Sequence, residues 1–281
     1  MKIVLLCKYH NHRKVIEILE AFRGQGLQVC GLVALDAPHS RLTFTELVRK
    51  AYHRGVWPFP KTKNVFAKSR LESSLHVIGR NGKAPQRAEQ AVQTLAEYAR
   101  QRSIPIVRVR DLNGDACAAA LQKFSVDLLI LGGTPIIRAS VLAVPRLGTL
   151  NVHMAALPEF RGMNVAEWSI YHDAPATVTV HFVDAGVDTG AVLYHEEIDV
   201  SDCHSIAEMR RKVSRQQHYV LAKAARKFAE NQSRPAPQDA AGGKQYYLMH
   251  AKLRHVVEQK LRRGYHSRNS QPGQAAIKKI T

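Results

Sequence analysis

Three polar residues of different chemistry lie at the ends of predicted strands. Asn151 and His153 are two positions apart in a predicted strand, residues 148–153, so their side chains point to one face of a sheet. Asp188 lies in a glycine-flanked turn after a second predicted strand, residues 177–183. Ligands of open α/β sheets bind beyond the carboxyl ends of strands. We therefore expect an amide, an imidazole and a carboxylate to meet in one site.

Together these groups suit acid–base catalysis of acyl transfer. A carboxylate beside an imidazole favours its charged form and fixes its tautomer. The imidazole can then take a proton from an attacking amine or give one to a leaving nitrogen, which is typically worth ~10²–10⁴-fold in rate. A primary amide can donate to an oxygen that gains negative charge. The spacing alone also fits a structural role, in which Asn151 caps the loop and His153 is a hydrogen-bonded core residue.

Other polar residues near strand ends each fit two roles. His10 follows the first predicted strand, where it can contact the acceptor, that is, the molecule that carries the attacking amine. His10 and His12 together do not predict a zinc site, because no carboxylate or cysteine is nearby. Arg161 can clamp a phosphate of the acceptor or be solvated. His181 lies on the same strand face as Thr179 and supports either the site or the core. We predict no metal site.

The first half of the chain alternates strands and helices. Strand 2–7, helix 15–22 and strand 27–35 make a β-α-β start, which predicts a parallel sheet with right-handed crossovers. Residues 36–83 are basic and in part proline-rich, and predict helices and loops over the sheet, near the acceptor side. The alternation continues with predicted helices at 86–102, 114–124 and 139–143 and predicted strands at 104–109, 126–131 and 148–153.

The second half predicts antiparallel strands followed by helices. Residues 177–183 alternate apolar and polar side chains, which is typical of a half-exposed strand, and residues 191–200 predict its antiparallel partner. Residues 205–230 carry one apolar stripe and predict a long helix. A turn-rich linker at 231–243 follows, then a basic helix at 245–263 and a disordered tail at 266–281.

The composition is that of a globular protein with an unusual charge. The chain has 281 residues, of which 45% are hydrophobic and 23% charged, and its net charge is +18. Residues 201–281 alone hold 17 basic and 5 acidic residues. Such a field favours anionic partners, namely phosphates, nucleotides, polyglutamylated cofactors or nucleic acid. The alternative is that the basic residues only solvate helix faces.

Cysteines and apolar runs favour a cytoplasmic protein. The four cysteines form no CxxC pair, which predicts neither a disulfide framework nor a thiolate metal site. The apolar run at residues 3–7 is too short for a signal peptide, and no stretch approaches the ~20 apolar residues of a membrane span. Neither GxGxxG nor GxxxxGK[ST] occurs, so we expect neither NAD nor a nucleoside triphosphate as cofactor.

Four consecutive motifs carry a family resemblance. They are VDLLILGGTPII from residue 126, PRLGTLNVH from residue 145, ALPEFRG from residue 156 and VTVHFVDAGVDTG from residue 178. In this order and spacing they resemble the folate-dependent formyltransferases, which include glycinamide ribonucleotide, methionyl-tRNA and nucleotide-sugar N-formyltransferases. The resemblance is good over residues 126–200, covers only the β-α-β start before them, and tells little about the last 80 residues.

The resemblance implies a fold and a domain plan. It implies an α/β protein with a Rossmann-like, mostly parallel sheet of the formyltransferase type and a helical C-terminal appendage. Residues 1–200 are expected to form the catalytic domain and residues 201–281 a basic, helical extension.

The resemblance also assigns roles within the site. Asn151 would polarise the formyl oxygen, His153 would act as acid and base, and Asp188 would pair with the histidine. The donor would be 10-formyltetrahydrofolate. Its pteridine would lie against two loops, formed by Pro135, Ile136 and Ile137 and by Ala185, Gly186 and Val187. The family often has a serine after the histidine where this chain has Ala155-Ala156, which puts the acceptor in doubt more than the reaction.

Several acceptors and two other functions remain open. A small amine on a phosphorylated or nucleotide-linked molecule, such as an amino sugar on a nucleoside diphosphate, suits the basic charge best. Methionyl-tRNA comes second, because helices rather than the family's β-barrel are predicted after residue 200. Glycinamide ribonucleotide comes third, because its enzymes resemble a shorter chain. A 10-formyltetrahydrofolate hydrolase, which would carry a preceding regulatory domain, and a non-catalytic nucleic-acid binder are the alternatives. The sequence leaves the acceptor, the oligomeric state and the roles of residues 36–83 and of the basic tail open.

Overall fold

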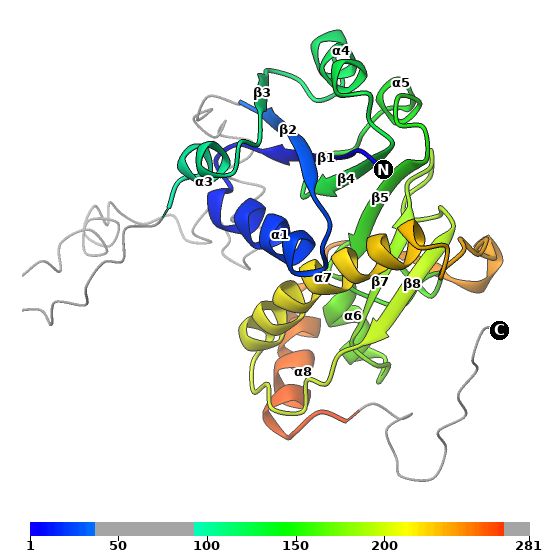
Figure 1. Ribbon diagram of the computed structural model, residues 1–281. Helices are drawn as coiled ribbons and strands as arrows, with labels where there is room; N and C mark the ends of the chain where they lie inside the picture. Colours follow the sequence, from blue (N-terminus) through cyan, green and yellow to red (C-terminus); the bar gives the residue numbers. More distant parts are fainter. Residues whose placement is uncertain (37–92, 267–281) are drawn as a thin grey trace, which may run out of the picture. The chain divides into compact units, whose positions relative to one another are not determined.

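The computed structural model describes residues 1–36 and 93–266 (Figure 1). The predictions for residues 37–83, for the start of the helix at 86–102 and for the tail at 267–281 fall outside these ranges. Among the described helices, none combines the length and the apolar composition that a membrane span requires.

The described residues are built around a seven-stranded sheet in the order β3-β2-β1-β4-β5-β7-β8. The first five strands in this order are mutually parallel, whereas β7 is antiparallel to β5 and β8 is antiparallel to β7. The predictions of a mostly parallel sheet and of antiparallel strands at its later edge are confirmed. The strands are β1 (Ile3–Lys8), β2 (Val29–Leu35), β3 (Ile106–Val109), β4 (Leu128–Gly132), β5 (Gly148–His153), β7 (Thr177–Phe182) and β8 (Val192–Glu197).

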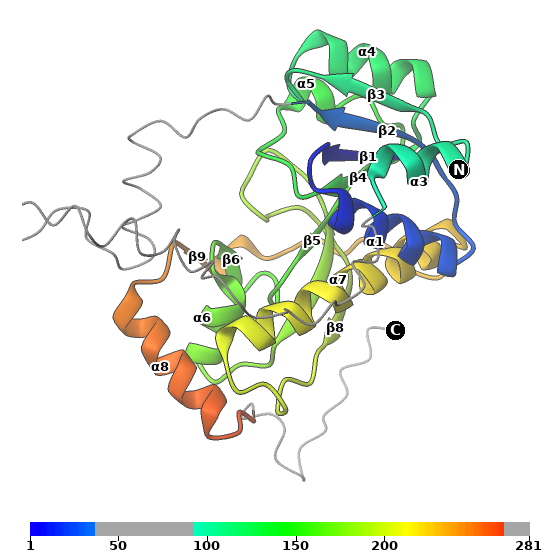
Figure 2. The same cartoon turned by 90° about the vertical axis from the view of Figure 1, so that its left-hand side faces the viewer.

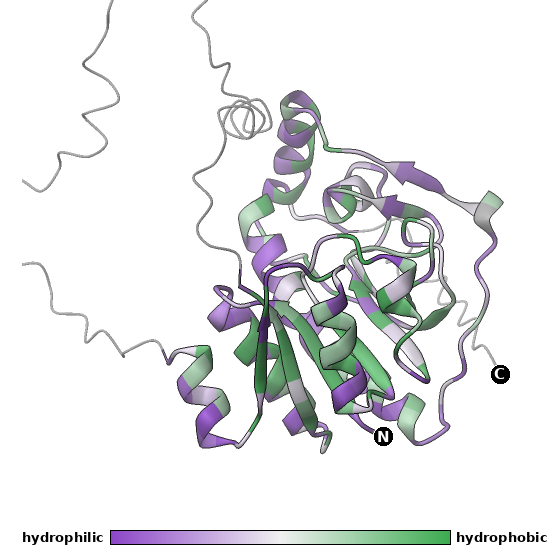
Figure 3. Ribbon diagram, turned by 90° about the horizontal axis from the view of Figure 1, so that it is seen from above, coloured by the Kyte–Doolittle hydropathy of each residue, from purple (hydrophilic) through white to green (hydrophobic). Residues whose placement is uncertain are grey.

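Helices cover both faces of this sheet (Figures 1 and 2). The central strands are apolar and the helices are apolar on one side and polar on the other, as Figure 3 shows, which is the pattern of helices that pack one apolar stripe on a sheet. Alternate strand residues face opposite sides, so Ile3 and Leu5 lie in the larger hydrophobic cluster and Val4 and Leu6 in the second. The larger cluster includes α1 (His12–Gly24), α3 (Leu95–Gln101) and α7 (Ile206–Ala229), and the second includes α4 (Asp115–Phe124) and α5 (Ala139–Leu142).

The long helix α7 is an integral part of the larger cluster. Its side chains at Met209, Val213, Val220 and Leu221 are fully buried. The Ser205 hydroxyl caps the helix by accepting a hydrogen bond from the backbone N–H of Glu208, so the predicted helix at 205–230 is confirmed almost to the residue. The division of the chain into domains at residue 200 stays a prediction.

Two helix boundaries differ from the sequence prediction. In the described residues the helix predicted at 86–102 begins at Leu95, after a capping box of Thr94 and Glu97. The final helix, predicted from residue 245, begins only at Ala251 as α8 (Ala251–Arg262). Before it, residues Lys244–Tyr246 form β9, which pairs in parallel with β6 (Phe160–Gly162). The pairing with a distant strand overrides the helical pattern there.

Candidate active site

The predicted catalytic residues stand on the sheet face opposite α1 and α7. Thr149, Asn151 and His153 alternate with Leu150 and Val152, which face the larger hydrophobic cluster. On β7, His181 pairs with Asn151 and Thr179 pairs with His153 in the antiparallel register. The two strands therefore present an amide and two imidazoles side by side.

The strand predicted to be half-exposed is covered on both faces. Thr179 and His181 are only 1% and 2% exposed, although their side chains alternate with the apolar ones as predicted. The Thr179 hydroxyl donates a 2.7 Å hydrogen bond to the carbonyl of Ala155, so the loop after β5 covers this face. The polar residues of β7 thus face a second layer of protein instead of solvent, and that layer is the loop after β5.

His153 is held by its Nε2 atom, which lies 2.6 Å from the carbonyl oxygen of Phe160. A carbonyl oxygen only accepts, so Nε2 carries a hydrogen and donates it. The Nδ1 atom faces Asp188, whose Oδ2 atom lies 3.5 Å away. Nδ1, on the side of the carboxylate, is therefore the ring nitrogen that is left to exchange a proton.

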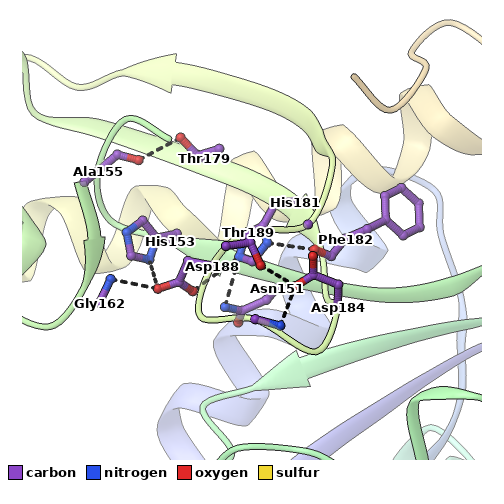
Figure 4. A network of polar contacts seen from close by, with 12 residues as sticks. Asn151, His153, Ala155, Gly162, Thr179, His181, Phe182, Asp184, Asp188 and Thr189 are labelled. Carbon is purple, nitrogen blue, oxygen red and sulfur yellow. Dashed lines mark hydrogen bonds and ion pairs between the residues drawn. The ribbon is translucent and has the colours of Figure 1, made fainter. Parts of the chain in front are cut away.

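Asp188 lies between the two histidines (Figure 4). Its Oδ2 accepts a 2.9 Å hydrogen bond from the backbone N–H of Gly162, and its Oδ1 lies 3.6 Å from Nε2 of His181. The residue has a φ of 54°, in the left-handed region that a non-glycine residue rarely adopts. This conformation folds the turn back over the sheet, so a residue after β7 reaches the side chains of β5.

The turn that carries Asp188 is fixed by its own polar contacts. Asp184 accepts hydrogen bonds from the backbone N–H of Gly186 at 3.0 Å and from the hydroxyl of Thr189 at 2.7 Å. A Cβ atom at Gly190 would lie 2.0 Å from the carbonyl oxygen of Phe182, so only glycine permits this close return to β7.

His181 lies beside both Asn151 and the carboxylate of Asp188. Its Nδ1 donates a 2.8 Å hydrogen bond to the carbonyl of Phe182, which leaves Nε2 as an acceptor toward Nδ2 of Asn151 at 3.4 Å. Burial lowers the pKa of His181 below its ordinary value, and a charge on His153 lowers it further, against the opposing effect of Asp188. A neutral His181 orients the Asn151 carboxamide, whose second N–H is then available to an oxygen in the site.

The loops predicted to hold the pteridine lie on the same sheet face. Ile137 is buried in the second hydrophobic cluster, and Val183, two residues before the second loop, packs against the same cluster. Ile136 is 84% exposed and Val187 44%, so each loop presents an apolar side chain to solvent. Pro135, Ala185 and Gly186 are exposed beside them.

Asn113 fixes the first of these loops. Its amide donates to the carbonyl of Ile136 at 3.0 Å, and its amide oxygen accepts from the N–H of Arg138 at 2.7 Å. Hydrogen bonds between Asn113 and the backbone on either side of Ile137 therefore hold Ile136 in its exposed conformation, and no sequence motif identified Asn113.

The two predicted acceptor contacts differ in their placement. Arg161 lies on β6 between Phe160, whose carbonyl binds His153, and Gly162, whose N–H binds Asp188, so its main chain runs beside the site. Its guanidinium donates to the carbonyl of Gly243 at 3.2 Å. His10 is exposed after β1, which β4 separates from β5.

A glutamine that the sequence did not indicate also contacts the turn. The side-chain N–H groups of Gln238 donate to the backbone carbonyls of Asp188, at 3.1 Å, and of Gly190. This residue lies in the turn-rich segment at 231–243, where no periodic pattern or motif marks it.

The arrangement can serve acyl transfer. An amide donor, an imidazole that exchanges a proton at one nitrogen and a carboxylate beside it converge on one buried face. Comparison with known proteins supports this chemistry. A family model described as "Formyl transferase" matches residues 67–225, more than half of the chain.

Individual relatives align with part of the chain. The methionyl-tRNA formyltransferase of Deinococcus radiodurans is 31% identical over 150 residues, which are 52% of this chain and 46% of that protein. That of Syntrophus aciditrophicus is 30% identical over 138 residues, 48% of this chain and 44% of that protein. The chain thus spans less than half the length of these curated relatives.

Solved structures show the same fold. Glycinamide ribonucleotide transformylase 1 from Symbiobacterium toebii superposes with a TM-score of 0.54 at 20% identity, covering 85% of this chain and 95% of that one. A 4-N formyltransferase from Francisella tularensis superposes with a TM-score of 0.53 at 12% identity, covering 92% and 87%. At such identities the likeness concerns the fold.

Proposed function

Because the chain belongs to the formyl transferase family, we propose that it moves a formyl group from 10-formyltetrahydrofolate to a primary amine. The observation that carries the proposal is the convergence of Asn151, His153 and Asp188 on one sheet face, with Asp188 returned to β5 by a left-handed turn.

Each residue has a role that its contacts permit. Asn151 donates its remaining N–H to the formyl oxygen as the amine attacks and the oxygen gains negative charge. His153 takes a proton from the amine at Nδ1 and delivers it to the departing nitrogen of the folate, so that a formamide and tetrahydrofolate leave. Asp188 stabilises the positive charge on the imidazole between these two proton transfers.

The two exposed loops fit the donor. A pterin ring is flat and apolar with polar edges, so it matches an apolar side chain beside backbone groups. Ile136 and Val187 supply exposed apolar surface, and residues 135–137 and 185–187 would supply the backbone donors and acceptors.

We propose a small, phosphorylated or nucleotide-linked amine as the acceptor. The main chain of Arg161 runs beside the reacting groups, its guanidinium is of the kind that holds a phosphate, and the net charge of +18 attracts an anion. Methionyl-tRNA is the second candidate, since the relatives described above bear that name and the helix α8 is basic. The described residues 201–266 fold mainly as α7 and α8, which gives the first candidate precedence. A cytoplasmic location stays a prediction.

The test is the release of tetrahydrofolate from 10-formyltetrahydrofolate, followed spectroscopically. Amino-sugar nucleotides, glycinamide ribonucleotide, methionyl-tRNA and water alone serve as acceptors. We expect one amine to accelerate release, and His153→Ala to reduce the rate by ~10²-fold or more. His195→Ala, which removes an exposed imidazole from β8, is the matched control and should retain the rate.

Three other outcomes of this assay would each contradict a part of the proposal. Release that needs no amine would identify a hydrolase. An equal loss of rate in His153→Ala and His195→Ala would contradict the catalytic role of His153. The absence of folate binding would contradict the proposed activity itself.

A further inference from the structure

The segment between α7 and α8 crosses both sides of the site. Residues 233–247, here called the strap, bind β8 where the Ala236 N–H and carbonyl pair with Val192 at 2.8 Å. Further along, the strap binds the Asp188 turn through Gln238, and its strand β9 pairs with β6. It lies beyond residue 225, where the family match ends.

Both attachments of Asp188 depend on the strap. The backbone carbonyl of Asp188 accepts from Gln238 on the strap itself. The carboxylate accepts from the N–H of Gly162, and Gly162 is held against β9 so closely that a Cβ atom there would lie 2.2 Å from the carbonyl oxygen of Tyr246. The strap therefore fixes the main chain and the side chain of the same aspartate.

Gln238 has the geometry of a clamp. Its primary amide nitrogen has two hydrogens, and each is donated to a carbonyl of the turn, one at Asp188 and one at Gly190. These carbonyls flank Thr189, so the clamp spans the backbone just after the left-handed residue. That conformation is intrinsically unfavourable and persists only when its surroundings hold it.

We propose that Gln238 is a positioning residue for formyl transfer, and that it acts through Asp188. The proposal rests on the function proposed above. The carboxylate lies 3.5 Å and 3.6 Å from its two histidine partners, so a small displacement of the turn changes its interaction with both. A misplacement of about 1 Å can cost ~10²-fold in rate.

The first test is Gln238→Leu, which removes both donors and leaves a branched apolar side chain one bond shorter. We expect kcat to fall about 10- to 100-fold while KM for the folate changes less than about threefold. Gln232→Leu, at an exposed position before the strap, is the matched control and should retain kcat.

A double-mutant cycle separates positioning from a general structural effect. In the Asp188→Asn background, Gln238→Leu should lower kcat by less than about twofold, because the group it positions is already disabled. The same fold-loss in both backgrounds, or an unchanged kcat in the single variant, would overturn the proposal. Gln238→Met repeats the cycle if the leucine variant does not fold.

A second measurement does not depend on activity. The ring nitrogen chemical shifts of His153 report on the carboxylate beside it, and the His153→Ala spectrum assigns them. We expect Gln238→Leu to move these shifts toward those of Asp188→Asn, and unchanged shifts would overturn the proposal. A wild-type protein that transfers no formyl group would contradict the proposed function and would leave the spectra to decide the role of Gln238.

Discussion

Replacing His218 by leucine should remove about 3 kcal/mol of pH dependence from the free energy of unfolding. His218 lies on α7 and is 3% exposed, and its Nδ1 is 3.6 Å from the carboxylate of Glu17 on α1. Burial lowers the pKa of His218 from 6.5 to about 4, with Lys14 adding to the shift and Glu17 opposing it. Burial prevails because Glu17 is 37% exposed and lies beyond hydrogen-bond distance.

The sign and size follow from the two protonation equilibria. In the unfolded chain the imidazole binds its proton as the pH falls through 6.5, whereas in the folded chain it does so only near 4. Between pH 6.5 and 4 the unfolded state therefore binds more protons than the folded state, and the free energy of unfolding decreases as the pH decreases. At about 1.36 kcal/mol per pKa unit, the loss between pH 6.5 and 4 is about 3 kcal/mol.

Urea denaturation at several pH values between 4 and 7 measures this term. The difference between wild type and His218→Leu isolates it, because the other titrating groups are common to both proteins. Val213→Ala on the same helix is the control: it should lower stability by about 2 kcal/mol at every pH, since it removes buried methyl groups without removing a titrating one. Parallel curves for wild type and His218→Leu would refute the lowered pKa of His218 and the reasoning built on it.

Three further predictions concern the site. Asp188→Asn should lower kcat for formyl transfer by ~10²–10⁴-fold, and a steady-state kcat within threefold of wild type would contradict its role. Ile136→Ser should raise the Kd for folate several-fold in a calorimetric titration and leave the melting temperature unchanged, because this side chain is 84% exposed. Val256→Ser on α8 is the control, and a Kd for Ile136→Ser equal to that of the wild type would exclude the loop from the donor site. Gly162→Ala should lower both kcat and the melting temperature, because its Cβ would meet the carbonyl of Tyr246, and a fully active, equally stable variant would show that β6 and β9 separate without consequence.

The sequence predicts those features that depend on local pattern. The two-residue spacing of Asn151 and His153 places them on one face, and the strand at 148–153 forms as predicted. Apolar periodicity likewise locates α7, because a stripe over seven turns has few alternative explanations.

Other features depend on contacts between distant segments. The three residues of β9 have no strand pattern, and they pair because β6 offers an open edge beside them. Gln238 reaches Asp188 across 50 positions of sequence, in a segment whose composition indicates only turns. The burial of Thr179 and His181 likewise depends on the loop that returns over β7, which no alternation of residues reveals.

The geometry of the trio favours a reactive site over a structural one. Buried polar groups that serve stability are normally paired at 2.7–3.2 Å, because unpaired ones are costly. The contact of His153 to Phe160, at 2.6 Å, is even shorter than this range, whereas the contacts of Asp188 to the two histidines, at 3.5 and 3.6 Å, are longer than it. In the proposed mechanism the short bond determines which nitrogen would react, and the longer contacts leave capacity for an incoming group, as catalytic hydrogen bonds often do before substrate binds. The turn is held instead through its backbone, by Gln238 and Gly162, so the carboxylate stays in place without satisfying its oxygens on the histidines. We therefore expect Asp188→Asn to cost activity without a matching loss of stability, and an equal loss of both would identify the trio as a structural network.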